Sequence, residues 1–159
     1  MWNHKDSYRV RNGIVQTSTI EYPSLGLVFF PAFDWKISAT HPERQERLLY
    51  TRDQIVEEGL LDVPNIREYN PIVADWDVIE RVHVGAPDLA SWVTDAHRVS
   101  AGGAIAAADA VLRGEVDRAF ALVRPPGHHA MAMVHGIRGF CTINIEAVMI
   151  QHIRLKPMV

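Results

Sequence analysis

The sequence has almost no cysteine, no long apolar run and no strong excess of charge. Its 159 residues include one cysteine, Cys141, which excludes an internal disulfide framework and is typical of a reducing compartment. The 16 Lys+Arg and 19 Asp+Glu give a net charge of −3. The two signs are interspersed, so neither a nucleic-acid partner nor a membrane surface is expected.

Segments that could target or anchor the chain are also lacking. The opening residues, MWNHKDSYRVRNG, contain no apolar segment of the kind that a signal peptide needs. The longest weakly polar run, SAGGAIAAADAVL, is interrupted by Asp109 and is too short to cross a bilayer. The hydrophobic fraction of 48% and the charged fraction of 22% are those of an ordinary globular domain. The chain is therefore expected to be soluble and cytoplasmic.

The chain divides into a short extension and one domain. Residues 1–24 are polar and show no convincing period, so they are expected to form an N-terminal extension, and residues 25–159 carry the domain. The apolar run LGLVFF, at 25–30, is closed by Pro31. A run of this kind is typical of a strand that is buried on both faces of a parallel sheet.

Helix and strand signals follow one another along the rest of the domain. A proline with acidic residues at the start of a segment, and a glycine at its end, predict a helix between Pro42 and Gly59. The other predicted elements are a strand within 65–75, a short helix over WDVIERVH with Asp75 as its cap, a helix at 101–113 capped by Ser100, a strand at 118–126, and a helix at 145–155 capped by Asn144.

This order of elements predicts an α/β architecture with a largely parallel sheet. In such sheets, functional residues gather in the loops that leave the carboxyl ends of the strands. The pair His128-His129 lies in a loop of this kind, directly after the predicted strand at 118–126. Pro125 and Pro126 restrict the approach to the pair, and Gly127 allows the backbone to turn.

Three interpretations of the histidine pair are open from the residues alone. The rings could be solvated or bonded to backbone without further function. They could bind a metal together with His135, although a loop does not fix the direction of three imidazoles as a helix would. They could also divide general acid and general base roles, because imidazole titrates near neutral pH.

The segment LVRPPGHHA, followed by GFCTIN, resembles the histone deacetylase family of zinc amidohydrolases, in its class II-like and bacterial form. The upstream segments THPERQERL, at 40–48, and ERVH, at 80–83, resemble the same family in the same order. The likeness covers about residues 25–155. It implies part of the arginase/deacetylase-like three-layer α/β fold, and hydrolysis of an acetylated amine such as acetyl-lysine or an acetylpolyamine.

The resemblance also implies roles for individual residues. His128 and His129 match the general base and general acid of the family. The remaining matches are Gly139 and Phe140, which correspond to residues lining the acyl-lysine tunnel, Arg44, which corresponds to an arginine near the inner end of the cavity, and Cys141 in the tunnel wall. In the intact family the cofactor is zinc, which polarises the acetyl carbonyl and activates a water.

The metal-binding half of the family pattern does not follow the histidine pair. Family members continue with an Asp-x-His motif, a later aspartate and a tyrosine, and none of these occurs after His129. We therefore expect the C-terminal half of the fold to be absent, no metal ligands in this chain, no zinc for the chain alone, and little or no activity without a companion chain.

Other functions remain as alternatives. A non-catalytic binding or assembly module could retain part of the deacetylase scaffold. A nucleotide site is disfavoured, because Gly102-Gly103 lack the further glycine spacing and the Lys-Ser/Thr of a phosphate loop. Cys141 as a nucleophile with His128 as its base is also disfavoured, since a buried structural cysteine is commoner. An exposed edge at strand 119–124 would favour a homo-oligomer or a companion chain.

Overall fold

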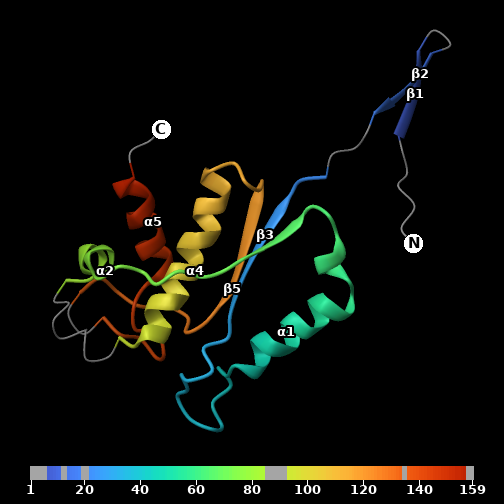
Figure 1. The fold of residues 1–159 in the computed structure, drawn as a ribbon. Helices are drawn as coiled ribbons and strands as arrows, with labels where there is room; N and C mark the ends of the chain where they lie inside the picture. Colours follow the sequence, from blue (N-terminus) through green and yellow to red (C-terminus); the bar gives the residue numbers. More distant parts are fainter. Residues whose placement is uncertain (1–6, 12–13, 19–21, 85–92, 134–135, 157–159) are drawn as a thin grey trace.

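A three-stranded parallel sheet lies at the centre of the fold. The computed structural model describes residues 7–11, 14–18, 22–84, 93–133 and 136–156. Strand β3 (Leu25–Phe30) is the middle strand, between β4 (Ile66–Tyr69) and β5 (Arg118–Val123). Both neighbours run parallel to β3. Figure 1 shows this sheet with helices on its two sides, which confirms the predicted α/β class.

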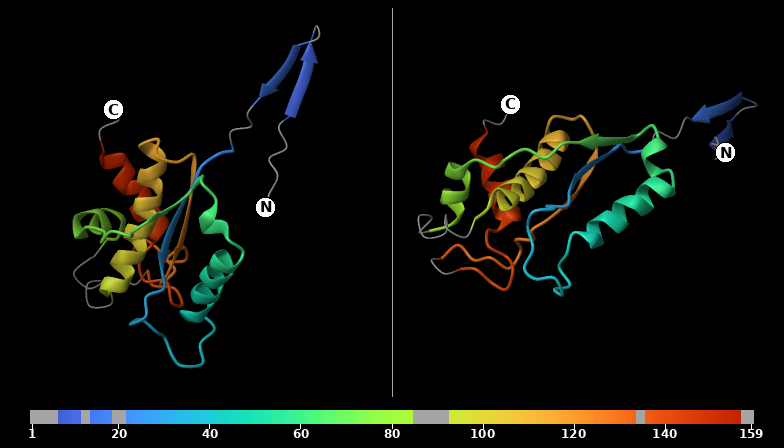
Figure 2. Two further views of the ribbon diagram at one scale, coloured as in Figure 1. Left: turned by 45° about the vertical axis from the view of Figure 1, so that its right-hand side comes forward. Right: turned by 60° about the horizontal axis from the view of Figure 1, so that its bottom comes forward.

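Alternating side chains of the sheet contact a different helix on each face. Leu27 of β3 and Leu122 of β5 pack with Leu48 of helix α1 (Glu46–Glu57). The next residues along the two strands, Val28 and Val123, lie against helix α4 (Asp95–Leu112). Because successive strand residues point to opposite faces, α1 and α4 must cover opposite faces of the sheet, as Figure 2 shows.

Two further helices pack with α4 on its side of the sheet (Figure 1). They are α2 (Trp76–Val82) and α5 (Ile145–Leu155). A short 3-10 turn, η1 (Leu60–Asp62), follows α1. Within the described part of the chain, no helix combines the length and apolarity that crossing a membrane requires.

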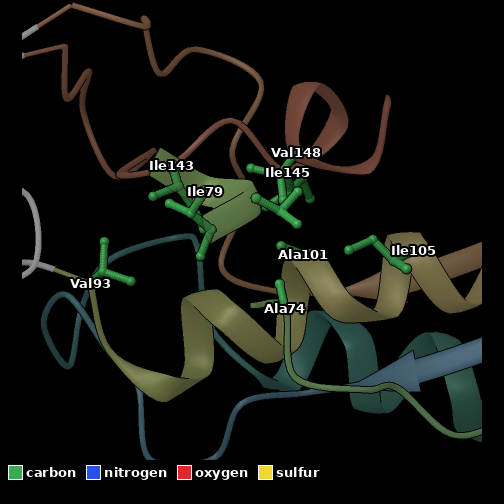
Figure 3. Close-up of a cluster of buried hydrophobic side chains, with 9 residues drawn as sticks. Ala74, Ile79, Val93, Ala101, Ile105, Ile143, Ile145 and Val148 are labelled. Atoms are coloured by element: carbon green, nitrogen blue, oxygen red, sulfur yellow. The ribbon is translucent and has the colours of Figure 1, made fainter. Parts of the chain in front are cut away.

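The larger hydrophobic core lies among α2, α4 and α5. Figure 3 shows Ile79 of α2 and Ala101 and Ile105 of α4 with residues of the α5 region. The full cluster consists of Ala74, Val78, Ile79, Val93, Ala101, Ile105, Ile143, Ile145 and Val148. Ile143 and Ile145 flank Asn144, so the segment that leads into α5 is itself part of this core.

The helix caps confirm one prediction and overturn another. Asn144 is the N-cap of α5, and its side chain accepts a hydrogen bond from the Ala147 amide at 2.9 Å. Ser100 is not a cap: α4 begins at Asp95 with Thr94 at its N-cap, so Ser100 lies inside the helix. The Ser100 hydroxyl is buried and donates to the Pro125 carbonyl at 2.7 Å, which explains why a helix tolerates a serine here.

Several boundaries also differ from the sequence pattern. Helix α1 begins at Glu46 rather than near Pro42. Strand β4 ends at Tyr69, two residues before Pro71, which agrees with the inability of proline to donate to a strand ladder. Asp75 occupies the N-cap of α2 but makes no capping bond with its side chain.

The N-terminal extension contains a hairpin that the polar composition did not predict. Strand β1 (Ser7–Arg11) pairs antiparallel with β2 (Ile14–Ser18) in register from Ser7↔Ser18 to Arg11↔Ile14. The two strands form a sheet of their own, separate from the three-stranded sheet.

The contact between α4 and the segment before α2 generates a test of the fold. A Cβ on Gly102 would lie 1.9 Å from the carbonyl oxygen of Ile72. Gly102→Ala should therefore lower the free energy of unfolding by about 1–3 kcal/mol through overpacking, although alanine is favoured over glycine in a helix by about 1 kcal/mol. Urea unfolding of the variant measures this, with Ala106→Gly as a control that reports helix propensity alone. A Gly102→Ala protein as stable as the wild type would contradict the close approach.

Candidate active site

Two loops leave the sheet at the same end of its strands and bring the candidate residues together. Because β3 and β5 are parallel, the loop that follows Phe30 and the loop that follows Val123 start at the same end of the sheet. The first loop, residues 31–45, carries Trp35, His41 and Glu43. The second, residues 124–144, carries the histidine pair.

The two adjacent imidazoles are exposed to solvent and contact each other. The rings of His128 and His129 meet edge to face, with their centroids 4.1 Å apart. The turn that carries them is closed by the Ala130 amide, which donates to the Gly127 carbonyl at 3.0 Å. Both rings are therefore available to a molecule that approaches from outside.

The GFC segment forms a tight reverse turn beside the pair. Arg138 and Cys141 exchange backbone hydrogen bonds of 3.1 and 2.9 Å across the turn. Gly139 at its tip has φ 57°, which glycine adopts without the strain that a side chain would add. Phe140 packs edge to face against His41 of the first loop, at 4.9 Å between centroids. The two loops thus meet at Phe140.

A group of possible metal ligands lies between the two turns. The ligand atoms of His128, His129 and Cys141 are all within 4.8 Å of one another. Burial raises the pKa of the buried Cys141 thiol, against a smaller opposing effect of the His129 backbone hydrogen bond. Metals bind the thiolate and not the thiol, so a metal held by these three residues would have to displace the proton of Cys141.

The structure does not bring Arg44 into this group. Its guanidinium is about half exposed, donates to the Ala39 carbonyl at 3.2 Å and lies 3.7 Å from the Glu46 carboxylate. A place for Arg44 at the inner end of a cavity stays a prediction. His135, the third histidine of the metal interpretation, lies outside the described residues.

A buried arginine, which the sequence analysis did not single out, joins the two loops. The Arg124 side chain is fully buried, and its Nη1 donates to the carbonyls of Pro31 and Ala32, each at 2.7 Å. Its Nε and Nη2 donate to the Glu43 carboxylate at 3.0–3.3 Å. Burial alone raises the pKa of Glu43, but hydrogen bonds from Arg124 and Arg47 outweigh it, so the pKa lies below its usual 4.5.

Three contacts, from α4 and from the segment that leads into α5, hold the turn that carries the pair. The buried Ser100 of α4 bonds the Pro125 carbonyl, as described above. Gly127 lies so close to the segment before α5 that a Cβ would be 2.3 Å from the Ile143 carbonyl oxygen. The Asn144 side-chain amide donates to the Ala130 carbonyl at 3.1 Å. The backbone of the turn is therefore fixed on both sides of the two imidazoles.

A buried histidine of α4 supports the first loop. His97 accepts a hydrogen bond at Nδ1 from the Thr94 amide at 3.1 Å, in the reciprocal pattern of a capping box. Its ring lies edge to face against Trp35, and the Arg124 guanidinium lies 4.9 Å from the centroid of the same Trp35 ring. Burial lowers the pKa of His97 to about 4. Its Nε2 has no hydrogen-bond partner among the described residues.

Comparisons with known proteins point to one family. A family model described as "Histone deacetylase domain" matches residues 88–159. A "Probable deacetylase" of Archaeoglobus fulgidus is 38% identical over 145 residues, which cover 79% of this chain and 40% of that protein. The "Polyamine deacetylase HDAC10" of Rattus norvegicus is 44% identical over 59 residues, or 37% of this chain and 10% of that protein.

A solved structure extends the likeness to the fold. The structure titled "Crystal Structure of HDA15 HD domain" superimposes with a TM-score of 0.65 at 26% identity. The match covers 80% of this chain and 42% of that chain. The chain thus spans about two fifths of the length of the archaeal relative and of this solved domain.

The buried neutral state of His97 predicts a dependence of stability on pH. Its folded pKa of about 4 lies below the usual 6.5, so the unfolded chain binds the proton more strongly. The stability of the fold should fall as pH drops below 6.5 towards 4, by about 3 kcal/mol from this ring. Urea unfolding at several pH values measures this. The His97→Gln variant retains a side chain suited to a capping box and should show a flatter dependence. An unchanged slope would contradict the prediction.

Proposed function

Because this chain belongs to the histone deacetylase family and carries part of its domain, we propose that it supplies the acid–base half of a deacetylase active site. The substrate would be an acetylated amine, of which acetyl-lysine and acetylpolyamines are the candidate classes. The name of the rat relative, a polyamine deacetylase, supports including polyamines. The single observation that carries the proposal is the exposed histidine pair on a turn whose backbone is fixed by buried contacts.

The proposed roles follow from the chemistry of imidazole. Amide hydrolysis needs one group that takes a proton from the attacking water and one that gives a proton to the leaving amine. His128 and His129 are close enough to act on the two sides of one reacting carbon, and both are accessible. Phe140, packed against His41, would present an apolar ring to the acyl chain of the substrate.

The catalytic metal of the family is proposed to be held outside this sequence. The ligand atoms that lie together in the described residues belong to two imidazoles and one thiol. The two imidazoles are assigned here to acid–base chemistry, so the three protein ligands that a catalytic zinc normally has are proposed to lie elsewhere. The alternative function, a non-catalytic binding or assembly module, would need neither the metal nor the two imidazoles, so substitution of the histidines distinguishes the two.

The first test concerns turnover in the complete enzyme, with the missing half supplied by a companion chain or by the full-length protein. His128→Ala and His129→Ala should each lower turnover by roughly 10²–10⁴-fold, the usual share of a general acid or base. Acetate release from acetyl-lysine peptides and from acetylpolyamines measures it. Phe140→Ala should act mainly on KM, and His152→Gln on α5 serves as the control. Full turnover in both histidine variants would refute the roles.

The second test concerns metal content. The chain alone should retain less than stoichiometric zinc after dialysis, because the histidine pair is assigned to acid–base chemistry and the zinc ligands are proposed to lie elsewhere. Elemental analysis of the purified 159-residue chain measures this. If zinc were bound tightly and one-to-one, and were lost in the His128→Ala/His129→Ala double variant, the pair would be metal ligands instead.

The third test concerns a partner at the sheet edge. Strand β5 pairs only with β3 in the described sheet, and Phe120 on it is 50% exposed. We propose that this edge pairs with a companion chain or a second copy, because an open apolar strand is a template for pairing. Light scattering during gel filtration at micromolar concentration should show a species heavier than one chain. A well-folded monomer that binds no partner would contradict this.

Placement in the cytoplasm is likewise a proposal. It rests on the single buried thiol, which suits a reducing compartment. Cell fractionation tests it.

A further inference from the structure

A buried histidine at the end of α2 contacts the segments on either side of the candidate site. His83 follows the last residue of the helix and is 3% exposed. It is the final residue of the ERVH segment, and no role has been given to it so far. Its two ring nitrogens contact two different segments of the site: Nδ1 lies 3.1 Å from the Met131 carbonyl oxygen, and Nε2 lies 2.9 Å from the Asn144 amide nitrogen.

The partners of the ring decide where its proton lies. A backbone amide can only donate, so Nε2 must accept and carries no hydrogen. A carbonyl can only accept, so Nδ1 must carry the hydrogen and donate. Both bonds are satisfied together only in the neutral Nδ1–H tautomer. Burial, which lowers the pKa of His83 against a smaller opposing effect of the Met131 bond, favours the same neutral form.

The two segments that His83 bonds, the one after His129 and the one that leads into α5, also bond each other. Met131 lies two residues after His129, and the next residue, Ala132, accepts a hydrogen bond from the Val84 amide at 2.6 Å. Asn144 caps α5 and also bonds Ala130, as described above. His83 therefore holds the segment after His129 in two ways. It bonds the Met131 carbonyl directly, and it bonds Asn144, whose side chain in turn bonds Ala130. Removal of its ring would leave the Met131 carbonyl and the partly buried Asn144 amide without these partners.

We propose that His83 is a positioning residue for the histidine pair, acting as the fixed Nδ1–H tautomer that joins the turn after His129 to the N-cap of α5. It does not touch a substrate. It acts through the backbone of residues 130–132 and through Asn144. Its importance for catalysis rests on the proposed function, but its tautomer and its effect on the turn do not.

The tautomer is tested first, on the unaltered chain. Nitrogen-15 NMR of the imidazoles at neutral pH distinguishes a ring protonated at Nδ1 from one protonated at Nε2 or at both. The His83 signals are assigned by their loss in His83→Gln. The expected result is the neutral Nδ1–H form. A ring protonated at Nε2, or a charged ring, would overturn the proposal whatever the variants do.

Two variants then test the positioning role. The His83→Gln side chain can still donate to one partner and accept from the other, whereas His83→Leu fills a similar volume without polar atoms. In His83→Leu we expect amide hydrogen exchange at Asn144 and Ala147 to become about tenfold faster, and the ring signals of His128 and His129 to shift. His83→Gln should restore both. His152→Gln, a histidine near Asp109 of α4, is the matched control.

The outcomes test the positioning role of His83 without any measurement of catalysis. Native exchange rates and native His128 and His129 signals in His83→Leu would reject the positioning role. If His83→Leu does not fold, the tautomer of the unaltered chain decides: a neutral ring protonated at Nδ1 supports the proposal, and a ring protonated at Nε2 or at both nitrogens rejects it. None of these measurements needs a substrate or a metal, so a failure of the deacetylase proposal would leave the result on His83 intact.

Discussion

The buried ion pair between Arg124 and Glu43 is the contact on which the site depends. Arg124 is fully buried and donates to a carboxylate and to two carbonyls. A buried guanidinium is tolerated only where its hydrogen bonds are nearly all satisfied, and loss of one partner of such a pair costs about 3–5 kcal/mol. One side chain at the end of β5 thereby holds the whole loop that follows β3. Ala32, one of the two carbonyl partners, has a φ of 48°, a strained value for alanine that this bond helps to maintain.

The rest of the site is built outward from that pair. Arg124 stands directly before Pro125-Pro126-Gly127, so its fixed position fixes the start of the turn that carries His128 and His129. In the loop that follows β3, Trp35 contacts both the Arg124 guanidinium and His97 of α4. His41 of that loop packs against Phe140. The two exposed imidazoles are therefore presented by a backbone whose supports are almost all buried. Such an arrangement suits acid–base groups, whose effect depends on their orientation.

The sequence pattern predicted the elements that carry their own local signal. The apolar runs of β3 and β5 and the Asn144 cap lie where they were expected. The Ser100 cap was wrong, because a capping box of Thr94 and His97 starts the helix at Asp95, and the buried Ser100 hydroxyl donates to the Pro125 carbonyl instead. The hairpin at 7–18 was missed, although Asn12-Gly13 between two short alternating segments is a known hairpin signal. The pairing of Arg124 with Glu43, 81 residues away, could not be predicted, since neither charge is marked as buried by its neighbours.

The dependence of the two loops on one ion pair is tested most directly by a double-mutant cycle. Arg124→Met, Glu43→Gln and the double variant are compared with the wild type by urea unfolding at neutral pH. If the pair joins the loops as described, each single change should cost about 3–5 kcal/mol, and the double variant should cost less than their sum by a coupling energy of about 1–3 kcal/mol. Additive losses would show that Arg124 and Glu43 act independently, and would contradict the account of the site.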